Sequence, residues 1–172
     1  MTSRSLSEDK PVGVIGAGNF GSAVANLLAP QRKVLLYARD IEVIERIRAT
    51  GENRGHKMHP NVEPVDDMQR VAEQCDVLFP IVPSAHFRSM MKRLSDYLHP
   101  YHILIHGTKG FDIRLTEGET IEEVKALDRS RVKTMSEVIL EESVVVRVGC
   151  LAGPNLWKEV AAGQPAATVV AS

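Results

Sequence analysis

A glycine pattern near the N-terminus constrains the fold of this chain more than any other feature. Residues 16–21 read Gly-Ala-Gly-Asn-Phe-Gly, which is the spacing GxGxxG. The preceding run, residues 11–15, is short, apolar and rich in β-branched side chains, as is typical of a strand buried on both faces. The apolar residues that follow recur with helical spacing, at Phe20, Ala23, Val24, Leu27 and Leu28. The sequence therefore predicts a strand, a tight turn and a helix.

Each glycine of this pattern has a separate role if the turn binds a dinucleotide. Gly16 permits the tight turn, and Gly18 lets a pyrophosphate approach the backbone because it carries no Cβ. Gly21 lets the helix lie close to the strand. The helix N-terminus offers unpaired N–H groups and the positive end of its dipole to the anion. Because a strand and a helix flank the pattern, we predict dinucleotide binding here; the alternative is a glycine-rich turn without a ligand.

Predicted strands and helices alternate along the rest of the chain. The strands are short apolar runs at residues 33–38, 76–82, 102–106, 144–148 and 166–171. The helices are indicated by apolar spacing and by N-terminal signals, at Asp40, Asp66, Ser84, the Thr134–Glu137 capping box and Pro154. Residues 51–64 are predicted to form an exposed loop, and residues 109–133 are compatible with a solvated helix, a long loop or a hairpin. Pro80 is unexpected in a central strand, because it has no N–H to donate.

This alternation predicts an α/β protein with a Rossmann-type, doubly wound, mostly parallel sheet and helices on both faces. A chain of 172 residues with 44% hydrophobic residues suffices for one such domain. We expect residues 1–10 to form a flexible N-terminal segment and residues 11–172 to form the dinucleotide-binding domain. Ligands of such sheets bind beyond the carboxyl ends of the strands, so the turns at Gly16, Pro83 and Gly107 are the expected places for chemistry.

The composition narrows the classes of partner. Lysine and arginine number 21 against 22 acidic residues, which gives a net charge of −1 and no basic excess for binding nucleic acid. No apolar run approaches the ~20 residues that cross a bilayer. Cys75 and Cys150 lie far apart without metal-binding spacing, so we expect no disulfide, no metal site and a reducing, cytoplasmic location. The expected partner is a small molecule, and the sequence leaves a homodimer open.

The residue at the end of the second predicted strand bears on the choice of cofactor. A site specific for NAD would place an acidic side chain there to bind the ribose hydroxyls, and this chain has Arg39 followed by Asp40. A guanidinium can pair with the additional phosphate of NADP or stack on the adenine, whereas Asp40 is explained as a helix cap. We therefore favour NADP(H) over NAD(H). The alternative is that Arg39 is an ordinary solvent-facing cation.

Four further stretches carry recognisable motifs. They read IVPSAHFR at residues 81–88, TKGF at 108–111, SEVI at 136–139 and LAGPNLWKEVAAGQPAATVVAS at 151–172. Together with VIGAGNFGSAVA at residues 14–25, they make the sequence resemble the N-terminal domain of the NAD(P)-dependent glycerol-3-phosphate dehydrogenases. Many dehydrogenases share the glycine pattern, but the VPS, KG and GPN-x-x-x-EVA-x-G-x-P motifs together are specific.

The resemblance implies a reaction and a set of site residues. The reaction is reversible hydride transfer between NAD(P) and carbon 2 of sn-glycerol 3-phosphate, which gives dihydroxyacetone phosphate. By motif match, cofactor contacts are implied for Asn19, Phe20, Pro83, Phe87, Lys109 and the backbone of Trp157. Substrate contacts are implied for Lys109, Gly153 and Asn155.

Lys109 is the candidate catalytic residue of this chain. It follows a predicted strand and Gly107 at the ligand-binding edge, where a cation could hold the anionic group of the substrate and polarise its C2 oxygen. The alternative is an ordinary surface lysine. His86 and His106 are interpreted as structural residues, because nothing in the sequence supplies a neighbouring group that would orient them.

The sequence also departs from the family it resembles. Trp157 stands where the family usually has a small residue, often alanine, and its indole adds bulk near the nicotinamide. In the family a helical C-terminal domain follows and supplies a general-base lysine and an Arg–Asn pair for the phosphate, whereas this chain stops at Ser172. We therefore expect the cofactor-binding half of a dehydrogenase, able to bind NAD(P)(H) but nearly inactive alone.

Two other functions are compatible with parts of the sequence. One is another two-domain Rossmann dehydrogenase, acting for example on hydroxy acids or ketopantoate, which would share the glycine turn but not the TKGF and GPN motifs. The other is a non-enzymatic regulatory module that senses NAD(H). Such a module predicts an acidic residue in place of Arg39 and has no need of Lys109.

Overall fold

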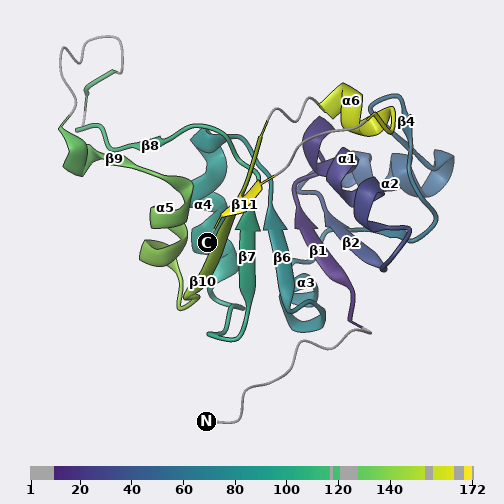
Figure 1. Ribbon diagram of the computed structural model, residues 1–172, viewed down its shortest axis with the longest axis horizontal. Coiled ribbons are helices and arrows are strands. Elements are labelled where there is room, and N and C mark those ends of the chain that lie inside the picture. The colour runs from purple at the N-terminus through teal and green to yellow at the C-terminus, as the bar shows by residue number, and fades with distance from the viewer. Residues whose placement is uncertain (1–9, 117, 121–127, 154–156, 165–168, 172) are drawn as a thin grey trace.

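The computed structural model describes residues 10–116, 118–120, 128–153, 157–164 and 169–171. Strands and helices alternate along most of the chain (Figure 1). The strands are β1 Val12–Ile15, β2 Val34–Tyr37, β3 Glu52–Asn53, β4 His56–Lys57, β5 Val62–Val65, β6 Val77–Pro80, β7 Ile103–His106, β8 Asp112–Ile113, β9 Val132–Lys133, β10 Arg147–Ala152 and β11 Val169–Ala171. The helices are α1 Asn19–Leu28, α2 Ile41–Thr50, α3 Met68–Gln74, α4 Ser84–Ser95, α5 Met135–Glu142 and α6 Trp157–Ala161, with a short 3-10 turn at Arg129–Arg131.

Seven strands form the main sheet, in the order β11-β10-β7-β6-β1-β2-β5. Neighbouring strands run parallel except β10 and β11, which are antiparallel. Because β1 lies between β2 and β6, the chain extends the sheet first to one side of β1 and then to the other. The strand order therefore reverses at β1, and the carboxyl ends of β1 and β6 frame the crevice where doubly wound sheets bind ligands. The predicted Rossmann-type fold class is confirmed.

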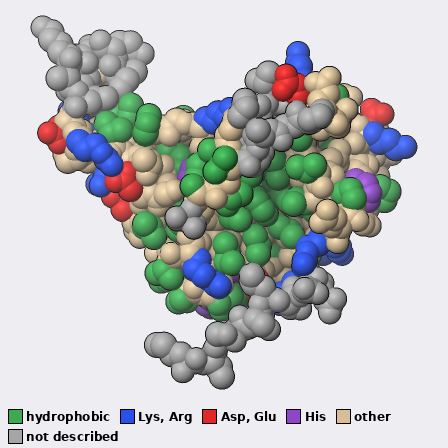
Figure 2. All heavy atoms as spheres, in the orientation of Figure 1, with side chains coloured by type: hydrophobic (Ala, Val, Ile, Leu, Met, Phe, Trp, Pro, Cys, Tyr) green, Lys and Arg blue, Asp and Glu red, His purple; other side chains and the backbone are tan. Residues whose placement is uncertain are grey.

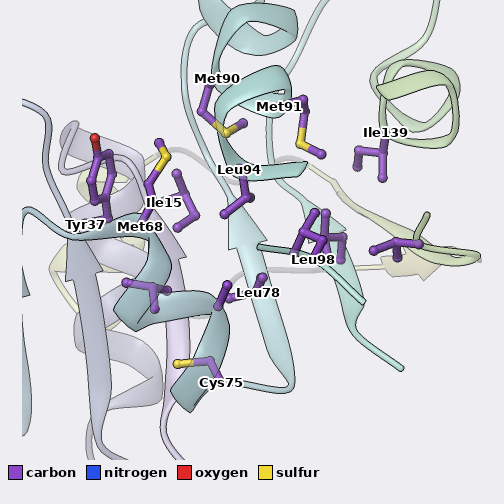
Figure 3. Packing of buried hydrophobic residues seen from close by; sticks show 14 of the residues in the cluster. Ile15, Tyr37, Met68, Cys75, Leu78, Met90, Met91, Leu94, Leu98 and Ile139 are labelled. Atoms are coloured by element: carbon purple, nitrogen blue, oxygen red, sulfur yellow. The ribbon is translucent and has the colours of Figure 1, made fainter. Parts of the chain in front are cut away.

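The core has two parts, one on each face of the sheet. The larger cluster joins α3, α4 and α5 to the sheet through residues such as Leu78, Met91 and Leu94, which are fully buried (Figure 3). The smaller cluster joins α1 and α2 to the sheet, with Val14 and Leu36 at its centre. Since successive strand residues point to opposite faces, Val14 and its neighbour Ile15 belong to different clusters. The turn between β1 and α1 is therefore anchored from both faces.

One part of the sheet is only half covered. Side chains of β6 and β7 that point away from the larger cluster are partly exposed, at Val77, Phe79, Ile103 and Ile105. Figure 2 shows hydrophobic side chains gathered over the middle of the sheet. The structure thus leaves an apolar surface beside the carboxyl-end crevice.

The prediction of an exposed loop at residues 51–64 is wrong. Two short strands, β3 and β4, form a hairpin, and β5 then pairs in parallel with β2 at the edge of the main sheet. Asn53 and Met58 are buried. Pro64 and Glu63 obscured the strand in the sequence; an edge strand tolerates both, because one of its sides forms no ladder.

The prediction of a strand at residues 144–148 is shifted. β10 begins at Arg147, and the side chains of Val144 and Val146 are 56% and 72% exposed. Local β propensity favoured the valine run, but pairing with β7, in which Arg147 lies opposite Ile103, sets the boundary. The predicted last strand is described only over Val169–Ala171, because residues 165–168 lie outside the described part.

The undecided segment between Lys109 and Lys133 contains a small hairpin at its ends. β8 pairs with β9 in antiparallel fashion, with Asp112 opposite Lys133. Of the three alternatives, the hairpin therefore holds for these residues.

The predicted strand at residues 76–82 is shorter in the structure. β6 ends at Pro80 rather than continuing to residue 82, so the missing N–H of the proline falls at the strand end, where a ladder bond is not required.

Two predicted helix caps are confirmed. The Asp40 carboxylate accepts a hydrogen bond from the Glu42 N–H at the start of α2, at 3.0 Å. Thr134 and Glu137 form a reciprocal capping box at the start of α5, with Thr134 N–H donating to Glu137 Oε2 at 2.7 Å.

Two other caps are displaced by one residue. Pro83, in extended conformation, occupies the N-cap of α4, and Ser84 is the first helical residue. Asp67 rather than Asp66 caps α3. Such shifts are the ordinary uncertainty of helix boundaries in a sequence. The predicted start at Pro154 lies outside the described residues. Of the helices described, none combines the length and hydropathy needed to cross a bilayer.

Candidate functional site

The glycine turn has the geometry that each glycine was predicted to supply. Gly16 has a φ of 120°, and a Cβ there would lie 2.2 Å from the Ile81 carbonyl oxygen. A Cβ at Gly21 would lie 1.9 Å from the Gly16 carbonyl oxygen, so α1 packs directly on the turn. A Cβ at Gly18 would have no described atom within 4 Å. Gly16 and Gly21 are therefore required by the fold, whereas the empty space at Gly18 faces outward and can admit a ligand.

The first turn of α1 presents free donors beside Gly18. Gly18 is the N-cap, and no side chain in the described part caps the helix. The N–H groups of Asn19, Phe20 and Gly21 have no partner within the helix, as at any helix start. They lie where the crevice opens, together with the positive end of the helix dipole. This arrangement suits a pyrophosphate.

Asn53 is a residue of this turn that the sequence did not reveal as such. Its side chain is completely buried and donates to the Ala17 carbonyl at 3.0 Å and to the Ser22 hydroxyl at 2.8 Å. Arg46 donates to the Asn53 carbonyl oxygen at 3.2 Å. The β3–β4 hairpin thus braces the glycine turn. A buried amide that bonds across more than 30 residues has no signature in the sequence.

A cavity of about 390 Å³ lies on one side of the glycine turn. Its walls combine the turn, the β6–α4 connection, the loop after β7 and the start of α6, and consist of Gly18, Asn19, Phe20, Gly21, Ile81, Val82, Pro83, Gly107, Thr108, Lys109 and Trp157. The walls are mainly apolar, and Lys109 is their only charged member among the described residues. Such a cavity suits a flat, largely apolar ring with one polar substituent.

The loop that carries Lys109 is held on two sides. The Thr108 hydroxyl donates to the Val82 carbonyl at 2.7 Å, and Gly107 N–H donates to the Pro80 carbonyl at 3.1 Å. Beyond Lys109, Gly110 has a φ of 109° and lies against Ser84. The Lys109 side chain is exposed and forms no ion pair with any described residue. Its ammonium is available to a ligand.

Salt bridges hold the chain immediately after this loop. Arg88 of α4 contacts Asp112 at 2.8 Å and Glu141 of α5 at 2.9 Å, and also pairs with Glu142. Arg88 and its three partners are mostly buried or half-buried side chains, so these pairs resist screening better than surface pairs do. The network fixes β8 against α4 and α5, three residues from Lys109.

A second cavity, also of about 390 Å³, lies on the other side of the turn. It runs from Gly16, Ala17 and Gly18 to the end of β2, where Arg39 and Asp40 line it. Both cavities share Gly18, Ile81, Val82 and Pro83, so they meet at the glycine turn. A ligand with two ring systems joined by a pyrophosphate would place one ring in each cavity. The structure therefore brings Arg39 and Lys109 to opposite ends of one continuous site.

The other residues implied by the resemblance are placed unequally. Trp157 lines the first cavity, and its indole meets the His56 ring edge to face with the ring centroids 5.0 Å apart. Phe87 is fully buried in the larger core cluster and is not among the described cavity walls, so its side chain does not line this cavity. Gly153 follows β10 with a φ of 142°, and its substrate contact stays a prediction. Asn155 lies outside the described residues.

The two histidines that were interpreted as structural residues are placed differently. His106 ends β7, is buried, and its Nε2 lies 3.0 Å from the Ser136 hydroxyl. Burial lowers the pKa of His106, which favours the neutral ring. His86 is exposed on α4 and lines the second cavity, so its structural role stays a prediction. Among the described residues, no three His, Cys, Asp or Glu side chains are grouped to hold a metal ion, and Cys75 and Cys150 are free thiols.

The fold and the paired cavities define a Rossmann-type dinucleotide-binding domain. Comparison with known proteins then gives the family. A family model described as NAD-dependent glycerol-3-phosphate dehydrogenase N-terminus matches residues 11–172. The chain belongs to this family, and the predicted resemblance is confirmed.

Curated relatives agree with this assignment. Glycerol-3-phosphate dehydrogenase [NAD(P)+] of Pseudomonas paraeruginosa is 36% identical over 97% of this chain and 46% of its own length. The enzyme of the same name from Pseudomonas fluorescens is 39% identical with the same coverage. The chain thus spans about half the length of the curated relatives it matches.

Solved structures show the same relationship. The glycerol-3-phosphate dehydrogenase of Coxiella burnetii superposes with a TM-score of 0.77 at 25% identity, covering 95% of this chain and 47% of that one. A ketopantoate reductase from Ralstonia eutropha reaches a TM-score of only 0.59 at 18% identity, covering 83% of this chain and 41% of that one, and shares the fold alone. The assignment to the family therefore rests on the family model and the curated relatives rather than on the fold alone.

Proposed function

We propose that this chain binds NAD(P)(H) across the glycine turn and forms the cofactor-binding half of a glycerol-3-phosphate dehydrogenase. The observation that carries the proposal is the open space at Gly18, between two cavities that meet there. The pyrophosphate would bind to the first N–H groups of α1, the adenosine would lie toward Arg39, and the nicotinamide would lie toward Lys109.

The proposed reaction is reversible. As glycerol 3-phosphate is oxidised, the hydride of carbon 2 passes to the nicotinamide, and the hydroxyl proton leaves to a base, which gives dihydroxyacetone phosphate. The bound dinucleotide supplies hydride acceptance and donation. Lys109 would stabilise the negative charge that develops on the C2 oxygen. We propose that the general base and further phosphate contacts come from a second domain, because Lys109 is the only cation among the described residues that line the first cavity.

Two titrations test the binding proposal. The chain is titrated with NADH and with NADPH, and the fluorescence of the nucleotide is recorded. We expect saturable binding of at least one of them with a stoichiometry of one per chain. Binding of neither nucleotide at millimolar concentration would refute the proposed function.

Lys109→Ala in the full-length enzyme tests the catalytic proposal. We expect turnover to fall by about 10²- to 10³-fold, the usual cost of removing one group that stabilises an oxyanion. Nucleotide affinity should change little, because the exposed ammonium lies at one end of a site whose pyrophosphate contacts are elsewhere. Unchanged turnover would identify Lys109 as an ordinary surface lysine and favour a nucleotide-sensing role.

We also propose that the half-covered face of the sheet promotes self-association of this chain. The support is the row of partly exposed apolar side chains on β6 and β7. Sedimentation velocity should show a concentration-dependent dimer, which Ile103→Thr should weaken, since threonine keeps the β-branched shape but adds a hydroxyl. A monomer at all concentrations would contradict this proposal.

We propose a cytoplasmic location for this chain. The free thiols of Cys75 and Cys150 support it, because a reducing compartment keeps thiols free.

A further inference from the structure

The second cavity contains more positive charge than the sequence analysis foresaw. Arginines from three separate elements line it: Arg39 after β2, Arg54 in the β3–β4 hairpin and Arg93 on α4. None of the three forms an ion pair with another residue in the described part of the chain. Guanidinium groups on one cavity wall that have no ion-pair partner are available to bind an anion.

The backbone of Arg54 is strained. Arg54 and Gly55 are the two central residues of the hairpin turn, with φ values of 50° and 79°. Two positive φ values define a type I′ turn, whose first central position normally holds Asn, Asp or Gly. Arg54 is the only residue other than glycine with a positive φ in the described part of the chain. A long cation at a position that disfavours it, on the wall of a cavity, points to a function for its side chain.

Arg93 is held at the same cavity by a neighbour. Its Nη2 donates to the Tyr37 hydroxyl at 3.2 Å, and Tyr37 is the last residue of β2, two positions before Arg39. On its other side Arg93 borders a hollow with Asp66, Asp67 and Asp96. No ion pair within the described residues joins it to these carboxylates.

The carboxylate nearest to Arg39 in sequence has another task. Asp40 lines the cavity, but its Oδ1 accepts the Glu42 N–H at 3.0 Å as the cap of α2. A site selective for NAD would use a free carboxylate to bind both ribose hydroxyls. Here one oxygen of the carboxylate is engaged in the cap, and the cavity also offers three guanidinium groups.

We propose that Arg39, Arg54 and Arg93 together bind the 2′-phosphate of NADP(H), so that Arg54 and Arg93 are specificity residues in addition to Arg39. Guanidinium groups recognise a phosphate dianion by paired, charge-assisted hydrogen bonds, and no such partner exists in NAD(H). The assignment rests on the proposed dinucleotide binding at the glycine turn. It adds two residues, 15 and 54 positions beyond Arg39 in the sequence, that only the fold brings together.

Arg93→Met and its matched control Lys92→Met test the role of Arg93. Both remove one positive charge from an exposed position on the same turn of α4, but only Arg93 is part of the described cavity wall. For Arg93→Met we expect the Kd of NADPH to rise about tenfold or more, while the Kd of NADH stays within about twofold. Lys92→Met should leave both Kd values within about twofold. Equal effects of the two variants would overturn the assignment of Arg93, because they would reflect net charge alone.

Arg54→Asn tests the role of Arg54 by the selectivity for NADPH over NADH, which a purely structural residue would not change. Asparagine accepts a positive φ more readily than arginine, so the melting temperature should stay the same or rise. The Kd of NADPH should rise about tenfold, with that of NADH unchanged. Loss of stability with unchanged nucleotide selectivity would overturn the role of Arg54.

The unaltered chain separates this inference from the function on which it rests. Binding of NADPH at least tenfold tighter than NADH supports it, and equal affinities overturn it while the proposed dinucleotide binding stands. Failure to bind either nucleotide overturns both. Inorganic phosphate at 10 mM should compete with NADPH and not with NADH; equal competition would place the phosphate at the glycine turn and contradict the three-arginine site.

Discussion

Substitution of Gly18 separates the ligand-binding role of the turn from its role in the fold. Gly18 has φ −72° and ψ −178°, a conformation open to any residue, and a Cβ there would meet no described atom within 4 Å. Gly18→Ala should therefore be tolerated, and the loss of chain entropy in the unfolded state should stabilise the fold by about 0.4–1 kcal/mol. The added methyl would occupy the space through which a pyrophosphate reaches the helix N-terminus.

The cost to binding follows from the contact that is lost. If the methyl displaces one charge-assisted hydrogen bond, binding weakens by about 1.5–3 kcal/mol, which is roughly a 10- to 150-fold increase in Kd. Unfolding in urea, followed by far-UV circular dichroism, measures the stability. Fluorescence titration with NADH and NADPH measures the affinity.

Gly21→Ala is the matched control on the same turn. A Cβ there would lie 1.9 Å from the Gly16 carbonyl oxygen, so backbone must move and the fold should lose about 1–3 kcal/mol. The two glycine-to-alanine substitutions, three residues apart, should therefore have opposite effects on stability. A Gly18→Ala variant that binds both nucleotides as the unaltered chain does would refute the proposed position of the pyrophosphate.

Two further predictions concern stability. Asn53→Ala should reduce the free energy of unfolding by about 1–3 kcal/mol, because it leaves the buried Ser22 hydroxyl and Ala17 carbonyl without their partner; an unchanged urea midpoint would contradict this. Hydrogen bonds from Thr134, and then from Arg129, lower the pKa of Glu137 to about 2. A carboxylate whose pKa is lowered on folding stabilises the protein above its usual pKa of about 4.5, and this contribution disappears as the pH falls toward 2. The melting temperatures of the unaltered chain and Glu137→Gln should therefore differ near pH 7 and converge near pH 2; a difference that persists at pH 2 would show that the capping box acts through shape rather than charge.

The sequence by itself determined those features that depend on local backbone requirements. The glycine turn is readable because Gly16 has a positive φ and Gly21 packs on the Gly16 carbonyl within one strand–turn–helix unit. The close approach of Ile81 to Gly16, in contrast, depends on the tertiary structure. The caps at Asp40 and at Thr134 and Glu137 are readable for the same reason, since a cap joins groups two or three residues apart. The functional interest of Lys109 was predicted from the resemblance of its TKGF motif to that of the dehydrogenase family.

Only the tertiary structure decided which distant residues share the site. Asn53 reaches the glycine turn across 31 to 36 residues, and Arg54 and Arg93 join Arg39 from a hairpin and a helix. Edge strand β5 and the shifted start of β10 were likewise set by pairing with β2 and β7 rather than by propensity. The physical reason is the same in each case: local sequence specifies conformation, whereas burial and the convergence of charge depend on how the elements pack.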